Sequence, residues 1–306
     1  MINNTDKEKE SSLPINISHV SKQFSRRNGL VNSQFLYAEI ASRLANNLKY
    51  IKIKPKNIVD SGCGIGNNLS ILQSIYKNFN YIGIDRSFHL LNIGHKKFKQ
   101  KGMFNKIKDI LTKKSVPIFI QSDMSASGLK SESIDMVWSN LALHWHNKPK
   151  SVIDEWHRIL KDNGLVVFSY FGPDTIKEVR SAINNAKIET EMMYFIDMHD
   201  VGDMLIHNGF ENPVMHKDTI TLTYKNPLRL LRDVHYIGGN ASMNRKKNLA
   251  SKAWLTALCE SLDKQRNNSL INLTIEIIYG HAWRKTNRKN NSEKTIKMAF
   301  QSTNSF

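Results

Sequence analysis

Three glycines at alternate positions, Gly62, Gly64 and Gly66, closely follow an acid, Asp60. A short apolar run precedes the acid and a helical spacing of apolar residues begins at Leu69, which is typical of a buried strand, a tight turn and a helix. Glycine in such a turn permits positive φ and lets a ligand lie against the backbone. The unpaired N–H groups at the start of the helix face the same ligand. The sequence therefore predicts a ligand-binding turn at the end of a strand.

The spacing of these glycines indicates which ligand the turn binds. A dinucleotide-binding turn, G-x-G-x-x-G, would need a glycine at position 67, where Asn67 stands. A second acid, Asp85, closes the next apolar stretch, where a carboxylate can accept hydrogen bonds from both hydroxyls of a ribose. The chain thus has an acid suited to a ribose but lacks the glycine that a pyrophosphate would need. This combination favours, as the ligand, a nucleoside that carries a sulfonium and an amino-acid tail. The alternative, a glycine-rich turn without function, does not explain why the two acids and three glycines are in register.

The rest of the chain alternates between strand and helix patterns, which predicts an α/β fold. After amino-terminal helices within residues 19–50, we expect helices at 67–76, 149–160, 198–210, 227–236 and 252–262. Two more are expected, one that begins at Ser87 and extends into the lysine-rich segment up to Lys114, and one from about 174 to 186. Strands are expected near 58–60, 80–85, 116–124, 133–141, 165–170, 214–224 and 273–283. The prediction is a seven-stranded, mostly parallel sheet with an antiparallel last strand. Residues from about 225 to 270, inserted between the last two strands, are expected to form a helical cap over the site.

The chain has 306 residues, of which 40% are hydrophobic, so it can bury a substantial core. Residues 1–18 are polar and are expected to be a disordered tail, followed by one domain over 19–283 and a basic disordered tail over 284–306. No apolar run approaches the ~20 residues needed to span a bilayer. With no secretory signal and only two cysteines, Cys63 and Cys259, we predict a cytoplasmic protein without a disulfide framework or metal site.

The net charge of +17 favours anionic partners. The alternative is that lysine and asparagine are abundant throughout. Eight lysines fall between Lys96 and Lys114, but few aromatic residues accompany them, so the segment is poorly suited to stacking on bases. We therefore predict no stable nucleic-acid complex and no membrane partner.

Three further stretches carry a resemblance to a known family: D-M-V-W-S-N-L-A-L-H-W at 135–145, F-G-P-D-T at 171–175 and F-I-D-M-H-D-V-G-D at 195–203. From Val20 to about Trp283 the chain resembles the BioC-type malonyl-[acyl-carrier protein] O-methyltransferases of biotin synthesis. These belong to the Rossmann-like class I methyltransferases that depend on S-adenosylmethionine. The resemblance implies that cofactor as methyl donor. It also implies an acidic acyl-carrier protein as partner, whose malonyl group is methylated at its free carboxyl to a methyl ester.

The resemblance also implies roles for particular residues. The glycines would cradle the methionine part of the cofactor, and Asp85 would bind the ribose. Asp123 and Met124 would frame the adenine. Asn140 and Leu141 would present backbone beneath the sulfonium. The complete predicted cofactor site is Asp60, Gly62, Cys63, Gly64, Gly66, Asp85, Asp123, Met124, Asn140 and Leu141. One departure is Val31, which stands where many family members have a tyrosine near the substrate.

A carboxylate is already a nucleophile at neutral pH, so its methylation needs placement and a dry site rather than a general base. A cation to orient the substrate is expected, with Arg26 or Arg27 as candidates; a surface pair is the alternative. His144 and Trp145, in the stretch His144-Trp145-His146, are candidates to line the methyl-transfer pocket, with packing in the core as the alternative and a metal site disfavoured.

The acidic carrier is expected to dock on the lysine-rich segment or on residues 245–247. Other functions remain open on the sequence: a methyltransferase acting on a quinone precursor or RNA, an arginine hydroxylase like the relatives that assist complex I assembly, or a binding module without catalysis. The intact glycine set and Asp85 argue against the last.

Overall fold

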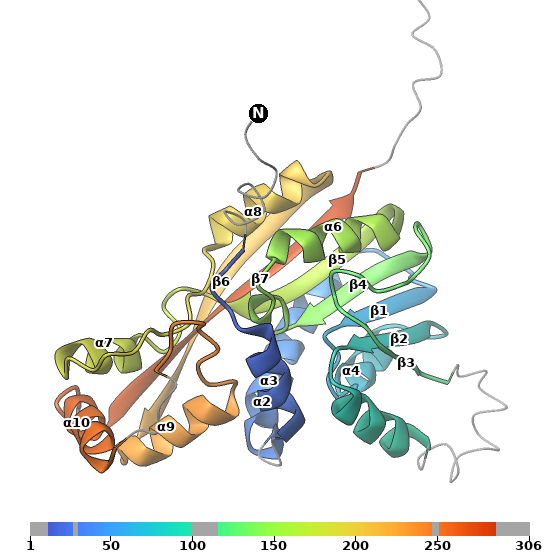
Figure 1. Cartoon of the computed structure of the whole chain (residues 1–306). Helices are drawn as coiled ribbons and strands as arrows, with labels where there is room; N and C mark the ends of the chain where they lie inside the picture. Colours follow the sequence, from blue (N-terminus) through green and yellow to red (C-terminus); the bar gives the residue numbers. More distant parts are fainter. Residues whose placement is uncertain (1–11, 27–29, 100–115, 247–250, 286–306) are drawn as a thin grey trace, which may run out of the picture.

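In the computed structural model, the residues described are 12–26, 30–99, 116–246 and 251–285. They form a seven-stranded sheet in the order β3-β2-β1-β4-β5-β7-β6 (Figure 1). Strand β7 is antiparallel to both of its neighbours and the remaining pairs are parallel, which confirms the predicted sheet. The strands are β1 (Asn57–Ser61), β2 (Asn80–Asp85), β3 (Ile118–Gln121), β4 (Ile134–Asn140), β5 (Leu160–Phe171), β6 (Phe210–Tyr224) and β7 (Ile271–Arg284).

The parallel register brings three chemically important strand ends together. Asp60 of β1 pairs with Gly83 of β2 on one side and with Trp138 of β4 on the other. The glycine turn after β1, Asp85 at the end of β2 and Asn140 at the end of β4 therefore meet at one edge of the sheet. Open α/β sheets bind their ligands at this carboxyl edge.

Helices cover both faces of the sheet because its strands alternate their apolar side chains between two cores. On β5, Leu165 and Val167 join one hydrophobic cluster, while Val166 and Phe168 join the other. The first cluster includes α3 (Leu30–Asn47), α4 (Asn68–Ile75), α7 (Lys177–Asn185), α9 (Pro227–Tyr236) and α10 (Lys252–Asp263). The second includes α6 (Pro149–Ile159) and α8 (Met198–His207). A further helix at residues 88–99 follows β2.

The amino-terminal segment corrects the expected domain boundary. Residues 12–18 are not a tail, because Leu13 N–H donates to Asn147 O at 2.7 Å and Ile15 is buried in a bridge to Ser242. Helix α2 (Ile17–Arg26) follows directly. At the other end, Arg284 is buried within β7 and is not part of a tail. Residues 1–11 and 286–306 lie outside the described part of the chain.

The helices inserted between β6 and β7 do not cover the site, which corrects the predicted cap. Helices α9 and α10 gather with α7 beside the ends of β6 and β7, whereas the glycine turn lies across the molecule beside α4 (Figure 1). The site is covered by α2 and α3 instead. Among the described residues, no helix has the length and apolar character needed to cross a bilayer.

Candidate active site

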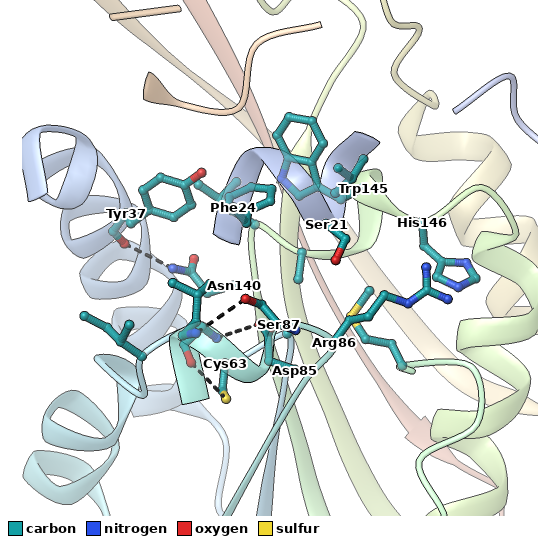
Figure 2. Close-up of a pocket in the computed structure, with 18 of the residues that line it drawn as sticks. Ser21, Phe24, Tyr37, Cys63, Asp85, Arg86, Ser87, Asn140, Trp145 and His146 are labelled. Atoms are coloured by element: carbon teal, nitrogen blue, oxygen red, sulfur yellow. Dashed lines mark hydrogen bonds between the residues drawn. The ribbon is translucent and has the colours of Figure 1, made fainter. Parts of the chain in front are cut away.

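A cavity of about 200 Å³ lies at the carboxyl edge of the sheet, between the strand ends and α2 (Figure 2). Its floor is formed by the glycine turn, Asp85 and the end of β4. Its cover is formed by Ile17, Val20, Ser21 and Phe24 of α2 together with Gln34 and Tyr37 of α3. Residues far apart in the chain thus enclose one site.

The glycine turn is built for close approach of a ligand. Gly62 has a φ of +78°, and a Cβ on it would lie 2.3 Å from the Cβ of Ala142. Gly64 has a φ of +56° and lines the cavity, and a Cβ there would meet no heavy atom within 4 Å. At Gly64 the backbone therefore faces open space in the cavity. At Gly66 a Cβ would lie 2.8 Å from the ring of Phe119, so this glycine serves packing.

Asp85 fixes the shape of the turn as well as lining the cavity. Its Oδ2 accepts from Gly64 N–H at 2.8 Å and its Oδ1 accepts from Ser87 N–H at 2.8 Å. Burial raises the pKa of Asp85, and the two backbone donors oppose that shift. Each carboxylate oxygen can accept further hydrogen bonds, which a ribose diol could supply.

Cys63 of the glycine turn also lines the cavity. Burial raises the pKa of the Cys63 thiol well above its usual value, so Cys63 is not a thiolate nucleophile.

Asp123 is held by two cationic or polar side chains of the cavity wall. His146 Nε2 lies 3.0 Å from Asp123 Oδ1, and Arg86 forms an ion pair with Oδ2. Lys148 N–H donates to His146 Nδ1 at 3.0 Å, so Nδ1 is the acceptor nitrogen and Nε2 carries the hydrogen that points to Asp123. The hydrogen bond from His146 lowers the pKa of Asp123, and Ser125 donates to the same oxygen. Asp123 is therefore an ionised, fixed acceptor.

The end of β4 is positioned by a buried network. Ser169 Oγ donates to Asn140 Oδ1 at 2.8 Å, and Asn140 Nδ2 donates to Tyr37 O at 3.1 Å. Leu141 has a φ of +52°, and its N–H lies 3.0 Å from Ser169 O. These contacts join β4, β5 and α3 and fix the backbone turn that passes beneath the cavity.

Helix α2 is held over the cavity by contacts to its rim. The Phe24 ring packs edge-on against Trp145 with centroids 5.4 Å apart, and both side chains line the cavity (Figure 2). Ser25 and Ser87 hydroxyls lie 3.1 Å apart and join α2 to the end of β2. These contacts place an aromatic cover over the polar strand ends.

Eight of the ten residues predicted for the cofactor line this cavity: Gly62, Cys63, Gly64, Asp85, Asp123, Met124, Asn140 and Leu141. The other two do not. Asp60 is fully buried and accepts from Tyr81 Oη at 2.6 Å and from Asn68 Nδ2 at 3.0 Å, and Gly66 packs against Phe119.

The three catalytic candidates divide in the same way. Trp145 lines the cavity, whereas His144 packs between Phe171 and Phe195 behind it. Burial lowers the pKa of His144 to about 3, so the ring is neutral, and Phe171 N–H donates to its Nδ1 at 3.4 Å. His144 is therefore a core residue, so of the two alternatives left open by the sequence, packing in the core is the one that the structure shows. Arg27 lies outside the described residues.

Several residues of the cavity wall were not predicted from the sequence. Arg86 and Ser87 follow Asp85 directly, and their place after a strand that ends at the ligand edge could have identified them. His146 carried no separate signal beside His144. The residues from α2 gave none, because their place over the cavity depends on contacts with distant parts of the chain.

The sheet order and the cavity at its carboxyl edge are those of the Rossmann-like class I methyltransferase fold. A family model described as a methyltransferase domain matches residues 59–168. The YcgJ protein from Bacillus subtilis shares this fold, with a TM-score of 0.55, 15% identity and coverage of 80% of this chain and 99% of that one. This structural likeness carries the fold alone.

Sequence relatives place the chain more narrowly. A malonyl-[acyl-carrier protein] O-methyltransferase from Gallionella capsiferriformans is 35% identical over 277 residues, which are 89% of this chain and 92% of that protein. One from Laribacter hongkongensis is 34% identical over 81% of this chain and 82% of its own length. The chain belongs to the malonyl-[acyl-carrier protein] O-methyltransferase family.

Within the described residues, no group of three or more His, Cys, Asp or Glu could hold a metal ion.

Proposed function

We propose that this protein transfers a methyl group from S-adenosylmethionine to the free carboxyl of a malonyl group carried by an acyl-carrier protein, forming the methyl ester. The observation that carries the proposal is the family membership at 35% identity over 89% of the chain. The cavity at the carboxyl edge of the sheet supports it. The cytoplasmic location expected from the sequence is part of this proposal.

The cavity wall fits the cofactor. At Gly64 the backbone faces open space that a Cβ would enter, which suits close contact with a ligand. We assign the amino-acid part of the cofactor to the glycine turn, the ribose to Asp85, and the adenine to Asp123 and Met124. When bound, S-adenosylmethionine supplies an electrophilic methyl group.

The protein's own contribution is placement and exclusion of water. A malonyl carboxylate is ionised at neutral pH, because an unperturbed carboxyl group has a pKa of about 4. It needs no general base, which agrees with a wall in which His146 is already committed to Asp123. Phe24 and Trp145 offer an apolar cover that desolvates the nucleophile and makes in-line attack favourable.

The experiment is methyl transfer from tritiated S-adenosylmethionine to purified malonyl-carrier protein, with acetyl-carrier protein as the matched acceptor that lacks the free carboxyl. Label on the malonyl form alone is expected. Label on both forms, or on neither while the cofactor still binds, would contradict the proposal. In that case a quinone precursor and RNA are the methyl acceptors to test next, and hydroxylation of arginine is the alternative reaction.

A further inference from the structure

The helix at residues 88–99 is fixed to the wall of the cavity. Gly94 packs so closely on the glycine turn that a Cβ there would lie 2.8 Å from the carbonyl oxygen of Ile65. Lys97 Nζ donates to Asn67 Oδ1 at 2.7 Å, and Asn67 lines the cavity. The inner side of the helix therefore packs on the cavity wall, and its outer side lies next to the rim of the cavity.

The outer side of this helix combines apolar and basic side chains. Phe88 is 64% exposed and Ile93 is 41% exposed, although both are large and hydrophobic. Lys96 and Lys99 are exposed on the turns that follow. Residues three and four apart on a helix are neighbours, so positions 88, 92, 96 and 99 form one exposed row, and Ile93 adjoins this row beside Lys96, three positions further on. Clustered apolar groups beside charged ones are typical of protein-binding surfaces.

Carboxylates are scarce in the stretches of sequence around this face. From residue 61 to residue 99 the only carboxylate is Asp85, and it lines the cavity. Residues 11–38, which include the α2 cover, contain no aspartate or glutamate. A basic surface with few carboxylates attracts an acidic partner and speeds its productive encounter.

We propose that the outer face of the helix at residues 88–99 is the docking surface for the acidic carrier protein. Phe88 and Ile93 provide the apolar contact, and Lys96 with Lys99 pair with carboxylates of the carrier. This inference rests on the proposed function, because the partner is the protein that delivers the malonyl group. Leu90, on the same helix, lines the cavity, so a thioester arm from a carrier docked here has a short path to the site.

The test compares Lys96→Glu/Lys99→Glu with a matched control, Lys52→Glu/Lys54→Glu. The control lysines are also exposed and precede β1, at the opposite edge of the sheet from the cavity. Two measurements are made on each full-length variant: the Kd for malonyl-carrier protein, and kcat/KM with malonyl-carrier protein and with malonyl-pantetheine, which lacks the carrier. Thermal unfolding verifies that each variant is folded.

Docking at this face predicts that Lys96→Glu/Lys99→Glu weakens carrier binding about tenfold or more and lowers kcat/KM with the carrier to the same extent. Activity with malonyl-pantetheine and all values for the control stay within about twofold of wild type. Phe88→Ala is expected to weaken carrier binding without changing the salt dependence. Unchanged carrier binding in the helix variant would overturn the inference, and so would equal losses with both substrates. Failure of the wild-type protein to methylate malonyl-carrier protein would instead contradict the proposed function, and the Kd measurement would still test docking.

Discussion

The hydrogen on Nε2 of His146 points at Oδ1 of Asp123 across 3.0 Å, and the tautomer is fixed because Nδ1 accepts from Lys148 N–H. Arg86 holds the other oxygen of the same carboxylate. The acid expected to contact the adenine is thus kept ionised and correctly oriented by side chains from two other segments. We therefore predict that His146 positions Asp123 for the cofactor.

His146→Ala is expected to weaken binding of S-adenosylmethionine about tenfold, since a hydrogen bond to a charged group contributes ~1.5–3 kcal/mol. His146→Gln retains an N–H donor and should recover part of the loss. Calorimetric titration of the cofactor measures both. His199→Ala is the matched control, because His199 also pairs with an aspartate, Asp197, but is 78% exposed and away from the cavity. Equal affinities for wild type and His146→Ala would contradict this role.

Gly64→Ala separates ligand contact from backbone strain. Gly64 and Gly128 both have positive φ, of +56° and +73°, and neither has a heavy atom within 4 Å of its Cβ position. Each alanine variant should therefore lose a similar stability, about 1–2 kcal/mol. Of these two glycines, only Gly64 lines the cavity. Only Gly64→Ala should therefore weaken binding of the cofactor, by about tenfold or more. Denaturant unfolding and calorimetry give the two quantities. Equal cofactor affinity in the two variants would show that the ligand does not approach Gly64.

Much of this site was predictable because it depends on local backbone chemistry. Gly62, Gly64 and Asp85 lie in one cavity wall, since parallel pairing of β1 and β2 brings the ends of these strands together. The seven strands and the antiparallel direction of the last one followed from the alternating patterns, whereas the order of the strands in the sheet was not predicted. The same reasoning assigned Asp60 and Gly66 to the ligand, although one is buried under Tyr81 and the other under Phe119.

Other features depended on geometry that spacing does not contain. His144 and His146 stand two residues apart, and a short 3₁₀ turn (Leu143–Trp145) sends the first into the core and leaves the second in the cavity wall. The α2 cover is anchored by pairing of Ile15 with Ser242, over 200 residues away. Contacts of that range decide that α2, and not the α9–α10 insertion, lies over the site.

Asp60 makes stability depend on pH. Burial raises its pKa to about 7 in the folded protein, against about 3.9 in an unfolded chain. Between these values the folded state holds a proton that the unfolded state has released, so the contribution of Asp60 to stability falls as pH rises. Asp60→Asn lacks this dependence. The free energy of unfolding is measured with urea at about pH 5 and about pH 8. Relative to wild type, the variant should be more stable at the higher pH than at the lower. If the difference in the free energy of unfolding between variant and wild type is the same at both pH values, Asp60 does not hold a proton in the folded state.

Gly238 supports the cavity from outside it. Its φ is +142°, and a Cβ there would lie 2.0 Å from the Trp145 ring. Gly238→Ala should displace Trp145 and lower kcat/KM for methyl transfer about tenfold or more. Gly202→Ala is the control, because Gly202 lies within α8 and its Cβ position is 3.8 Å from Met215 Cγ, an ordinary contact. Steady-state kinetics that are the same for both variants would show that Trp145 has no part in placing the substrate.

The site of methylation on the product is the measurement that decides between carboxyl methylation and every other reaction of this fold. Malonyl-carrier protein is incubated with the enzyme and S-adenosylmethionine, and fragmentation mass spectrometry of the released acyl arm locates the methyl group. The structure and the family predict one methyl group, on the free carboxyl as an ester that mild base removes. A methyl group on carbon, on the carrier polypeptide or on no part of the malonyl form would contradict the assignment of a carboxylate nucleophile to this cavity.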